Sequence, residues 1–381
     1  MPPDPPARHG PSPRVALVHD WLTGMRGGEK VLEALCGLYP AATLFTLLHV
    51  RGSVSARIEA RRPRQTWVGR LPGVARYYRG LLPLFPAAIE TIDLDGFDLV
   101  ISTSHCAAKS VVVAGRARHL CYCFTPMRYA WDQFDAYFGA DRVGPGSRLL
   151  RPALRGLAAW DRATSDRPHR YVAISQYVAA RIARYYNRGS AIVYPPVDTT
   201  FFTPSPEPPG DHALVVSALV PYKRIEVAIE ACRLARRPLR VVGDGPEAVR
   251  LRRMAGPEVT FLGRVSDEAV RDEYRRAAAV ILPAEEDFGI VPVEAQACGR
   301  PVVALARGGS RETVADGETG VLVHDCTPAA FAEGLDRVAR LSPPPRAVRQ
   351  HAERFATERF LAEFAGHVNA LLDAPEGAAR W

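Results

Sequence analysis

Residues 286–301 read EDFGIVPVEAQACGRP and follow the apolar run 277–284, which has the length of a buried strand. Gly289 suits a turn, and Pro292 suits the first turn of a helix because no amide proton is needed there. The stretch therefore predicts a strand end, a turn and a helix start. α/β proteins with parallel sheets are built from repeated units of this kind, in which a strand is followed by a turn and a helix.

The same stretch carries two carboxylates and a set of free amides. Glu286 falls on the predicted loop and Glu294 in the first turns of the helix. The amides at the start of the helix can point at an anion, because a helix N-terminus leaves its first N–H groups unpaired. These amides belong to Phe288, Gly289, Ile290 and Val291. A carboxylate on either side could bind hydroxyl pairs, so the layout fits a sugar nucleotide; the alternative is a helix with two unrelated surface carboxylates.

Strand-length apolar runs alternate with helical patterns along the whole sequence. The run 14–19, for example, precedes a helical pattern at 29–38. The expected strands are 14–19, 97–102, 119–124 and 170–175 in the first half, and 213–217, 239–243, 259–263, 278–282, 301–304 and 319–323 in the second. This alternation predicts an α/β protein whose parallel sheets are covered by helices.

A proline-rich segment interrupts the alternation once. Prolines occupy 195 and 196, and the segment 204–210 contains four more, which is linker composition. The expected organisation is a disordered tail at 1–13, a first domain at 14–195, a linker at 196–210 and a second domain at 211–349. Two doubly wound, Rossmann-like domains would face a central cleft at the carboxyl ends of their strands, where ligands bind.

Composition excludes several classes of protein. Of the 381 residues, 47% are hydrophobic and 24% charged, which is ordinary for a globular chain and excludes a disordered or fibrous one. The longest apolar runs have about eight residues, whereas a membrane-spanning helix needs about 20. The tail at 1–13 lacks the apolar stretch of a secretory signal. Seven scattered cysteines without a Cys-x-x-Cys pair indicate a reducing compartment, so we expect a cytoplasmic protein without a structural metal.

Positive charge is concentrated in the first half of the chain. Residues 1–200 carry a net charge of +11, and the remainder carries −3. The densest part is 51–90, which has eight arginines against Glu59 and Glu90. The arginines are Arg51, Arg57, Arg61, Arg62, Arg64, Arg70, Arg76 and Arg79.

Aromatic and aliphatic side chains lie among these arginines, namely Trp67, Tyr77, Tyr78, Leu84 and Phe85. A basic segment of this kind suits an anionic membrane surface, so we expect peripheral association with the inner face of the plasma membrane. Two alternatives are a solvated arginine face and a nucleic-acid surface. No recognised nucleic-acid motif accompanies the charge, so nucleic acid is not an expected partner.

Glu286 and Glu294, with the surrounding Phe-Gly and Ala-Cys-Gly-Arg-Pro-Val, resemble the Glu-x7-Glu signature of the family 4 retaining glycosyltransferases of GT-B fold. The resemblance extends from Val15 to about Phe364. It implies that Glu286 contacts the donor sugar and that Glu294 contacts the ribose. It also implies that a last helix, at about 350–372, crosses back to complete the first domain.

Two cations follow the first strand of the second domain. Lys223 and Arg224 could neutralise the charge that develops on a departing nucleoside diphosphate without a metal. The resemblance implies that Lys223 has this role. Many family members also carry an arginine five residues earlier, where this chain has Ala218, so Arg224 is a possible substitute. The alternative is a solvated basic turn.

The run Gly243-Asp-Gly-Pro-Glu-Ala fits a dinucleotide fingerprint by pattern. A nicotinamide dinucleotide site would need an acidic residue about twenty positions further on, where Gly263 and Arg264 stand instead. The run resembles the equivalent turn of the glycosyltransferase family, which lies near the nucleotide. We therefore place Gly243, Gly245 and Arg264 at the nucleotide.

A glycine-rich loop, with Gly27 and Gly28, follows the first strand of the first domain. Such a loop lets backbone amides approach a phosphate or an acceptor; the alternative is a helix-capping loop without a ligand. With Ser104-His105, Lys109 and the run 125–132, it resembles bacterial O-antigen and exopolysaccharide mannosyltransferases. The resemblance places Gly27 and Gly28 at the donor. The residues expected to face the acceptor or the sugar are His19, His105, Phe124 and Arg128.

Phe124 is a departure from those relatives, which commonly have a histidine at this place, facing the donor sugar. Three explanations stay open: the histidine is dispensable, His105 or His19 fills its space, or the protein has lost activity. The motif Asp93-Leu94-Asp95 could be taken for a manganese site, but it precedes a strand instead of following one, so we interpret it as a turn.

Together these features predict a retaining glycosyltransferase that moves a hexose, expected to be mannose from GDP-mannose, to a lipid-linked or oligosaccharide acceptor in cell-surface polysaccharide synthesis. No cofactor or metal is expected. The alternatives are a non-catalytic subunit that binds a nucleotide sugar, for which Phe124 and Ala218 are the motive, and a GT-B sugar-nucleotide epimerase or phosphorylase. A phosphorylase would need a pyridoxal-binding lysine, which the sequence does not identify.

Overall fold

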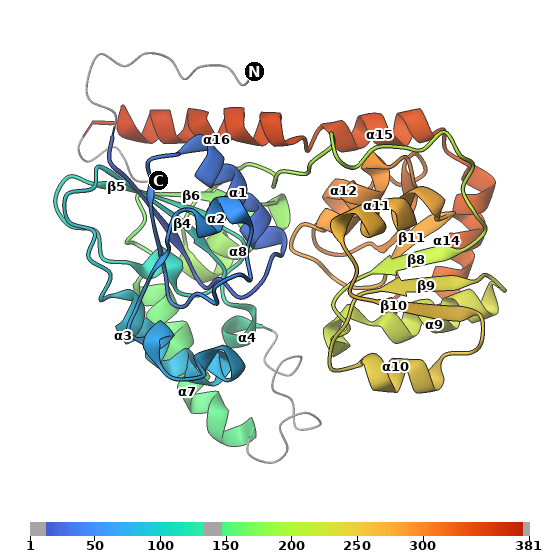
Figure 1. The fold of residues 1–381 in the computed structure, drawn as a ribbon, viewed down its shortest axis with the longest axis horizontal. Coiled ribbons are helices and arrows are strands. Elements are labelled where there is room, and N and C mark those ends of the chain that lie inside the picture. Colours follow the sequence, from blue (N-terminus) through green and yellow to red (C-terminus); the bar gives the residue numbers. More distant parts are fainter. Residues whose placement is uncertain (1–12, 133–146, 376–381) are drawn as a thin grey trace. The chain divides into compact units, whose positions relative to one another are not determined.

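The computed structural model describes residues 13–132 and 147–375 of the chain. These residues form two compact units, and Figure 1 labels most of their helices and several of their strands. Unit 1 comprises Met1–Pro196 together with Phe360–Trp381, and unit 2 comprises Val197–Arg359. Of the tail expected at 1–13, all but Pro13 lies outside the described residues.

Unit 1 is built on a parallel sheet that has seven strands among the described residues, in the order β3-β2-β1-β4-β5-β6-β7. The strands are β1 (Val15–His19), β2 (Thr43–Thr46), β3 (Arg64–Gln65), β4 (Leu99–Ser104), β5 (Arg118–Cys123), β6 (Arg170–Ala173) and β7 (Ala191–Ile192). The interior strand β1 is buried along its whole length, which explains its continuous apolar sequence. All its strands point the same way, so the loops that follow β1 and β4 emerge at one edge.

The helices of unit 1 follow the strands in alternation (Figure 1). They are α1 (Gly27–Leu38), α2 (Ala56–Glu59), α3 (Phe85–Ile89), α4 (Arg128–Trp131), α7 (Ser147–Ala163) and α8 (Gln176–Tyr186). Local sequence sets their ends. For example, the Ser175 hydroxyl accepts a hydrogen bond from the Val178 amide at the start of α8, and Asn187 ends that helix in the left-handed conformation.

The last helix, α16 (Thr357–Leu372), packs within unit 1 from Phe360 onward. The rings of Phe360 and Phe364 lie 5.6 and 5.7 Å from the ring of Tyr122 on β5, centroid to centroid. All three side chains are buried, so this aromatic cluster fixes a segment from the end of the chain against the middle of the sheet. The helix is preceded by α15 (Pro345–Glu353) in unit 2.

Unit 2 has a second parallel sheet, with six strands among the described residues in the order β10-β9-β8-β11-β12-β13. The strands are β8 (Ala213–Val216), β9 (Leu239–Val242), β10 (Val259–Gly263), β11 (Ala279–Leu282), β12 (Val302–Leu305) and β13 (Gly320–Val323). The helices are α9 (Ile225–Leu234), α10 (Ala248–Met254), α11 (Asp267–Arg276), α12 (Ile290–Ala297), α13 (Ser310–Thr313), α14 (Pro328–Leu341) and α15. Its core includes Val241, Ile281, Val303 and, from α14, Phe331 and Leu335.

The basic segment 51–90 folds mainly as short helical turns. Three 3-10 helices, at Val68–Arg70, Val74–Arg76 and Tyr78–Leu84, precede α3. Tyr78 and Phe85, which the sequence grouped with the membrane-facing aromatic residues, are buried in the core of unit 1. That part of the expectation was wrong, because these two rings pack against Trp21 and are not available to a surface.

Three residues of the segment do present large apolar or aromatic groups to solvent, namely Trp67, Tyr77 and Leu84. Among the arginines around them, Arg70, Arg76 and Arg79 are exposed. Arg61 instead donates hydrogen bonds to the backbone carbonyls of Pro40 and Cys36, so it holds unit 1 together. None of the helices among residues 13–132 and 147–375 has the length and apolarity needed to cross a membrane.

Candidate functional site

Lys223 and Glu286, 63 residues apart in the sequence, meet in unit 2. The Lys223 ammonium donates a hydrogen bond to Glu286 Oε1, and about one fifth of each side chain is exposed. Lys223 ends a 3-10 turn after β8, and Glu286 follows β11, the neighbouring strand. Because the strands are parallel, both loops emerge at the same edge of the sheet. The structure thus brings the predicted cation and the predicted sugar-binding carboxylate into direct contact.

Backbone contacts of Glu286 with the loop after β12 fix the position of this residue. Its carbonyl accepts a hydrogen bond of 2.8 Å from the Gly309 amide, and it forms an isolated parallel bridge with Gly308. The loop after β11 is therefore tied to the loop after β12. This tie fixes the direction from which the Glu286 side chain reaches Lys223.

The helix α12 begins at Ile290, directly after a glycine in the left-handed conformation. Gly289 has φ +88°, which a residue with a Cβ adopts only with strain. Gly289 has no side chain with which to cap this helix, so the first amides of α12, at Ile290 and Val291, donate no hydrogen bond to a side chain of the N-cap residue. These are two of the amides for which the sequence predicts anion binding.

Glu294 lies in α12 with about 5% of its surface exposed. One of its oxygens, Oε2, accepts a hydrogen bond of 3.0 Å from the Tyr274 hydroxyl, which comes from α11. Burial, followed by the charge of Glu294, raises the pKa of Tyr274, so the phenol keeps its proton and acts as a donor. Tyr274 was missed by sequence reasoning because nothing in its local sequence indicates a contact with a residue twenty positions away.

Gly243 and Gly245 line the turn after β9, where another part of the chain comes very close. A Cβ on Gly243 would lie 1.8 Å from the Ser217 carbonyl oxygen, and one on Gly245 would lie 2.4 Å from that of Leu219. These two glycines are therefore required by the packing of the β9 loop on the β8 loop. This packing brings the turn beside the segment that leads to Lys223.

Arg224 and Arg264 lie less close to the Lys223–Glu286 pair. Arg224 adopts a left-handed conformation (φ +54°) at the start of α9, and its Nε donates to Glu226 Oε1 at 2.8 Å. Arg264 is exposed and follows β10, the edge strand of the sheet. Within the described part of unit 2, neither arginine forms a hydrogen bond or ion pair with Glu286.

A second group of candidate residues lies in unit 1 at the ends of β1 and β4. Asp20, fully buried, accepts backbone hydrogen bonds of 2.7–2.9 Å from four consecutive amides, those of residues 105–108. Its Oδ2 also lies 3.1 Å from Nδ1 of His105. Burial opposes the charged carboxylate, but His105 and these hydrogen bonds outweigh it and lower the pKa of Asp20 to about 2.

The same pairing acts on His105. Burial disfavours the imidazolium, yet the negative charge of Asp20 raises the pKa of His105 above its usual value. Its side chain is about one third exposed, so the ring is held on one side by Asp20 and open on the other. Sequence reasoning proposed His105 and overlooked Asp20. The sequence feature that could have indicated Asp20 is an acidic residue directly after the first strand.

Phe124 lies between the two histidines that could replace the missing one. Its ring centroid is 6.3 Å from that of His19 and 6.3 Å from that of His105. A Cβ on Gly28 would lie 3.3 Å from the Phe124 ring, so the ring closes the space over the start of α1. Gly27, in contrast, has open space where a Cβ would point. The structure therefore groups His19, His105, Phe124 and Gly28.

His19 is more enclosed than His105. Its Nδ1 hydrogen-bonds with the Thr103 hydroxyl at 2.8 Å, and its Nε2 lies 3.9 Å from Glu29. Both of its ring nitrogens thus have neighbours inside unit 1, and the residue is 1% exposed. Arg128, the remaining candidate, begins α4 and is also buried.

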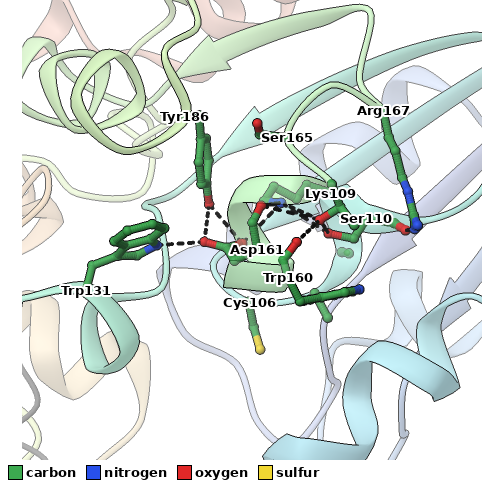
Figure 2. Close-up of polar contacts among 12 residues, drawn as sticks. Cys106, Lys109, Ser110, Trp131, Trp160, Asp161, Ser165, Arg167 and Tyr186 are labelled. Carbon is green, nitrogen blue, oxygen red and sulfur yellow. Dashed lines mark hydrogen bonds and ion pairs between the residues drawn. The ribbon is translucent and has the colours of Figure 1, made fainter. Parts of the chain in front are cut away.

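Lys109, which belongs to the resembling segment, lies in the interior (Figure 2). Its ammonium is 3.1 Å from Asp161 Oδ1 and donates to the Asp161 carbonyl at 2.7 Å. Tyr186 and Trp131 donate to the same carboxylate at 2.9 and 2.8 Å, as Figure 2 shows. The cluster pins the turn Ala108–Ser110 to α7, α8 and α4. It is a packing element that holds the far end of the loop that carries His105.

No group of three or more histidine, cysteine, aspartate or glutamate side chains within residues 13–132 and 147–375 is placed to hold a metal. In the segment Asp93–Asp95, the Asp93 carboxylate accepts a hydrogen bond of 2.9 Å from the Asp95 amide. That is the local bond of a turn, as the sequence predicted.

The chain is similar to known glycosyltransferases. A family model described as "Glycosyl transferases group 1" matches residues 200–355. A D-inositol 3-phosphate glycosyltransferase of Mycolicibacterium gilvum is 34% identical over 207 residues, which are 48% of this chain and 47% of that protein. A GDP-mannose-dependent alpha-(1-6)-phosphatidylinositol monomannoside mannosyltransferase of Mycolicibacterium smegmatis is 34% identical over 181 residues, 39% of this chain and 47% of that protein. The chain thus spans about half the length of the curated relatives it matches.

Solved structures match over nearly the whole chain. A glycosyltransferase from Rickettsia africae has a TM-score of 0.63 at 18% identity and covers 96% of this chain and 100% of its own. HepE of Anabaena in complex with UDP-glucose has a TM-score of 0.66 at 18% identity, with coverage of 93% and 99%. At this identity the likeness concerns the fold. Residues 200–355 therefore match the group 1 glycosyl transferase family, and the chain has the two-sheet GT-B fold that its resemblance implied.

Proposed function

We propose that the protein is a retaining glycosyltransferase that transfers a hexosyl group from a nucleoside diphosphate sugar. The observation that carries the proposal is the pairing of Lys223 with Glu286 in unit 2, where Glu286 stands four residues before the start of α12. A cation, a carboxylate and a helix N-terminus match a donor that has a diphosphate and a sugar with vicinal hydroxyls. The family match over residues 200–355 supports the same assignment.

Each group has a proposed role toward the donor. Glu286 accepts hydrogen bonds from hydroxyls of the transferred sugar, and Glu294, held by Tyr274, accepts them from the ribose. The amides of Phe288–Val291 bind the diphosphate. Lys223 exchanges part of its contact with Glu286 for the departing phosphate, where negative charge grows in the transition state.

The proposed reaction needs no metal and no covalent enzyme intermediate. The bond between the anomeric carbon and the diphosphate oxygen breaks, and its electron pair leaves with the diphosphate. The acceptor hydroxyl oxygen forms the new bond on the same face, which retains the anomeric configuration. Its proton passes to the leaving phosphate oxygen. Lys223 and the start of α12 supply positive potential that a metal would otherwise provide.

The donor that we favour is GDP-mannose, and the acceptor a lipid-linked or oligosaccharide one in cell-surface polysaccharide synthesis. One relative is named as GDP-mannose-dependent, which supports mannose as the transferred sugar. HepE was solved with UDP-glucose, so the donor test compares guanine and uracil nucleotides. The exposed Arg70, Arg76 and Trp67 of unit 1 support an acceptor at an anionic membrane surface. We place the protein in the cytoplasm, bound peripherally to the membrane.

A panel of nucleotide sugars tests the proposal directly. The full chain is incubated with GDP-mannose, UDP-glucose and UDP-N-acetylglucosamine, and release of the nucleoside diphosphate is measured with and without a lipid-linked acceptor. We expect one donor to be turned over, also in EDTA, and turnover to fall at least about 100-fold in Glu286→Gln. Glu333→Gln, an exposed carboxylate on α14, is the matched control and should keep full turnover.

The outcome separates the proposal from its alternative. Tight binding of a nucleotide sugar in calorimetry, without turnover of any donor, would favour a non-catalytic binding subunit. Phe124 and Ala218 are the two departures from the family that suggest this alternative. Full loss of transfer in EDTA, restored by manganese, would contradict the metal-free mechanism.

A further inference from the structure

Unit 2 contains a pocket of about 280 Å³ at the amino ends of its strands. The walls include residues at or just before the first positions of β8, β9, β11 and β12, and the last two turns of α14. Lys223 and Glu286 follow the carboxyl ends of β8 and β11, so they lie at the other edge of this sheet. The pocket is therefore separate from the candidate donor site of the same unit.

Two arginines line this pocket, and neither has a partner among the described residues. Arg300 is 4% exposed, and its Nε is buried without a hydrogen-bond partner. Arg237, which is half-buried, also has no ion pair or side-chain hydrogen bond in the part of the chain that the structure describes. No aspartate or glutamate is among the lining residues. The pocket thus combines two cations with no counter-charge.

The buried positive charge of Arg300 lacks an anionic partner among the described residues that line this pocket. A guanidinium remains protonated under all ordinary conditions, and burying such a charge without a partner is strongly unfavourable. Burial lowers the pKa of Arg300, in line with this cost. The helix α12 ends at Ala297 and α14 ends at Leu341, so the partial negative charges of two helix ends lie near and offset some of it. Those ends supply no hydrogen bond to the guanidinium within the described residues.

Apart from the two arginines and Ser342, the wall is apolar. It is formed by prolines, alanines and aliphatic side chains, among them Pro209, Pro301, Leu335, Val338 and Pro345. A volume of about 280 Å³ lies at the lower end of the range for small-molecule sites, below that of pockets for drug-sized ligands. A ligand that fits both properties has one anionic group and a small apolar body.

We propose that this pocket binds a small phosphate monoester, whose phosphate is held by Arg300 and Arg237 and whose organic part packs against the prolines and α14. The planar guanidinium of arginine offers two parallel N–H donors, which match phosphate oxygens. The site lies on the sheet that carries the candidate donor loops and would be occupied independently of the donor.

Phenyl phosphate is the probe that tests this proposal, because it combines a phosphate with a small apolar ring. Binding to the full chain is measured by calorimetry and by the melting temperature Tm, with inorganic phosphate and neutral benzyl alcohol as comparisons. We expect phenyl phosphate to raise the Tm by about 3–6 °C at ten times its Kd. Inorganic phosphate should bind more weakly, and benzyl alcohol should not stabilise the protein.

Three variants assign the binding to the pocket. Arg300→Met removes the charge at similar volume, and we expect it to abolish the Tm response while leaving the unliganded protein at least as stable. Arg253→Met, an exposed arginine on α10, changes the net charge equally and should keep the response. Lys223→Ala should also keep the Tm response, because Lys223 lies at the donor site and not in this pocket. A response lost in Lys223→Ala and kept in Arg300→Met would instead place the phosphate at the donor site.

Specific results would overturn the proposal. A response to phenyl phosphate that is the same in Arg300→Met as in the wild type would place the anion elsewhere, and an absence of binding to the wild type would show that Arg300 is a structural cation only. Should Arg300→Met not fold, Arg237→Met decides, since this side chain is half-buried. We expect it to weaken binding at least about tenfold, the loss typical of a charged hydrogen bond, and an unchanged Kd would contradict the assignment.

Discussion

Glu286 and Glu294 are eight residues apart, but their surroundings predict different effects when either is removed. Glu286 is partly exposed beside Lys223, whereas Glu294 is buried against Tyr274. We expect Glu286→Ala to lower turnover at least about 100-fold with little change in affinity for the free nucleoside diphosphate. Glu294→Ala should weaken that affinity about 10- to 100-fold, the loss of a charged hydrogen bond. Calorimetry with the diphosphate measures both affinities.

Tyr274→Phe is the control for Glu294, because it removes the hydroxyl and leaves the carboxylate in place. A smaller loss of affinity than in Glu294→Ala would assign the main effect to the carboxylate. Equal losses of diphosphate affinity in Glu286→Ala and Glu294→Ala would refute the division of roles between sugar and ribose.

The Asp20–His105 pair predicts a measurable change in a histidine pKa. Asp20 raises the pKa of His105 against the effect of burial; Glu29 acts in the same direction as Asp20, and Arg26 opposes both. In Asp20→Asn the main stabilising charge is gone and burial still disfavours the imidazolium, so the pKa should fall below its usual value of about 6.5. Histidine NMR titration measures this, with His105→Gln assigning the signal. An unchanged pKa would show that Asp20 serves only to hold the loop amides.

At the scale of single elements, the start of α12 depends on one glycine. Gly289 has φ +88°, where an added Cβ costs about 1–2 kcal/mol. Gly289→Ala should therefore lower the Tm and also misplace the amides at 288–291, which weakens diphosphate binding. Gly317→Ala is the matched control: φ there is +78° and the space beyond is open, so it should lower the Tm by a similar amount. Diphosphate binding should be kept in Gly317→Ala, and a loss there would mean that strain alone explains the effect.

The Lys109–Asp161 pair connects the turn Ala108–Ser110 with α7 and predicts a large effect on unit 1. Lys109→Met leaves a fully buried carboxylate without its cation, which costs about 3–5 kcal/mol of the free energy of unfolding. Urea unfolding followed by tryptophan fluorescence reports on unit 1, since it contains every tryptophan of the chain. Asp166→Asn, which removes an exposed ion pair with Arg188, should cost less than about 0.5 kcal/mol. Similar costs in the two variants would contradict a structural role for the buried pair.

Sequence patterns predicted the long and strongly apolar elements better than the short ones. The runs at 14–19 and 213–217 became β1 and β8, because buried parallel strands leave an uninterrupted apolar signal. The strand Thr43–Thr46 was missed, since an element of only four residues carries little pattern. The 3-10 turns of Tyr78–Leu84 were missed as well, because a segment with a glycine and a proline has no regular period.

Candidate site residues were accessible to sequence reasoning where they stand in a motif. Lys223 and Glu286 were proposed independently, and their contact follows from two neighbouring parallel strands. The partners Asp20 and Tyr274 were not found, because each acts through a residue far away in the sequence and is held by tertiary packing. The sequence therefore indicates the candidate residues of the site, and the structure adds the residues that contact and hold them.

At the scale of the whole molecule, the asymmetry of charge predicts reversible membrane binding through unit 1. Residues 1–200 carry +11 and the rest −3, and near Trp67 and Tyr77 the side chains of Arg70 and Arg76 are exposed. Each basic residue close to an anionic surface contributes about 1 kcal/mol, so replacing Arg70 and Arg76 by glutamine should weaken vesicle binding about 30-fold. Arg61 is left in place because it supports the backbone of unit 1. Co-sedimentation with phosphatidylserine vesicles at low salt measures the effect.

The control for this prediction removes the same charge from unit 2. Arg253 and Arg346 are exposed there, and replacing both by glutamine should change vesicle binding much less, because the charge of that half is already negative. Raising the salt concentration should weaken wild-type binding, since exposed charges are screened beyond about 8–10 Å at physiological ionic strength. Turnover of a soluble acceptor analogue should stay unchanged in both pairs of variants. Equal effects of the two pairs, or a wild-type protein that ignores anionic vesicles at low salt, would mean that the arginines of unit 1 form a solvated face.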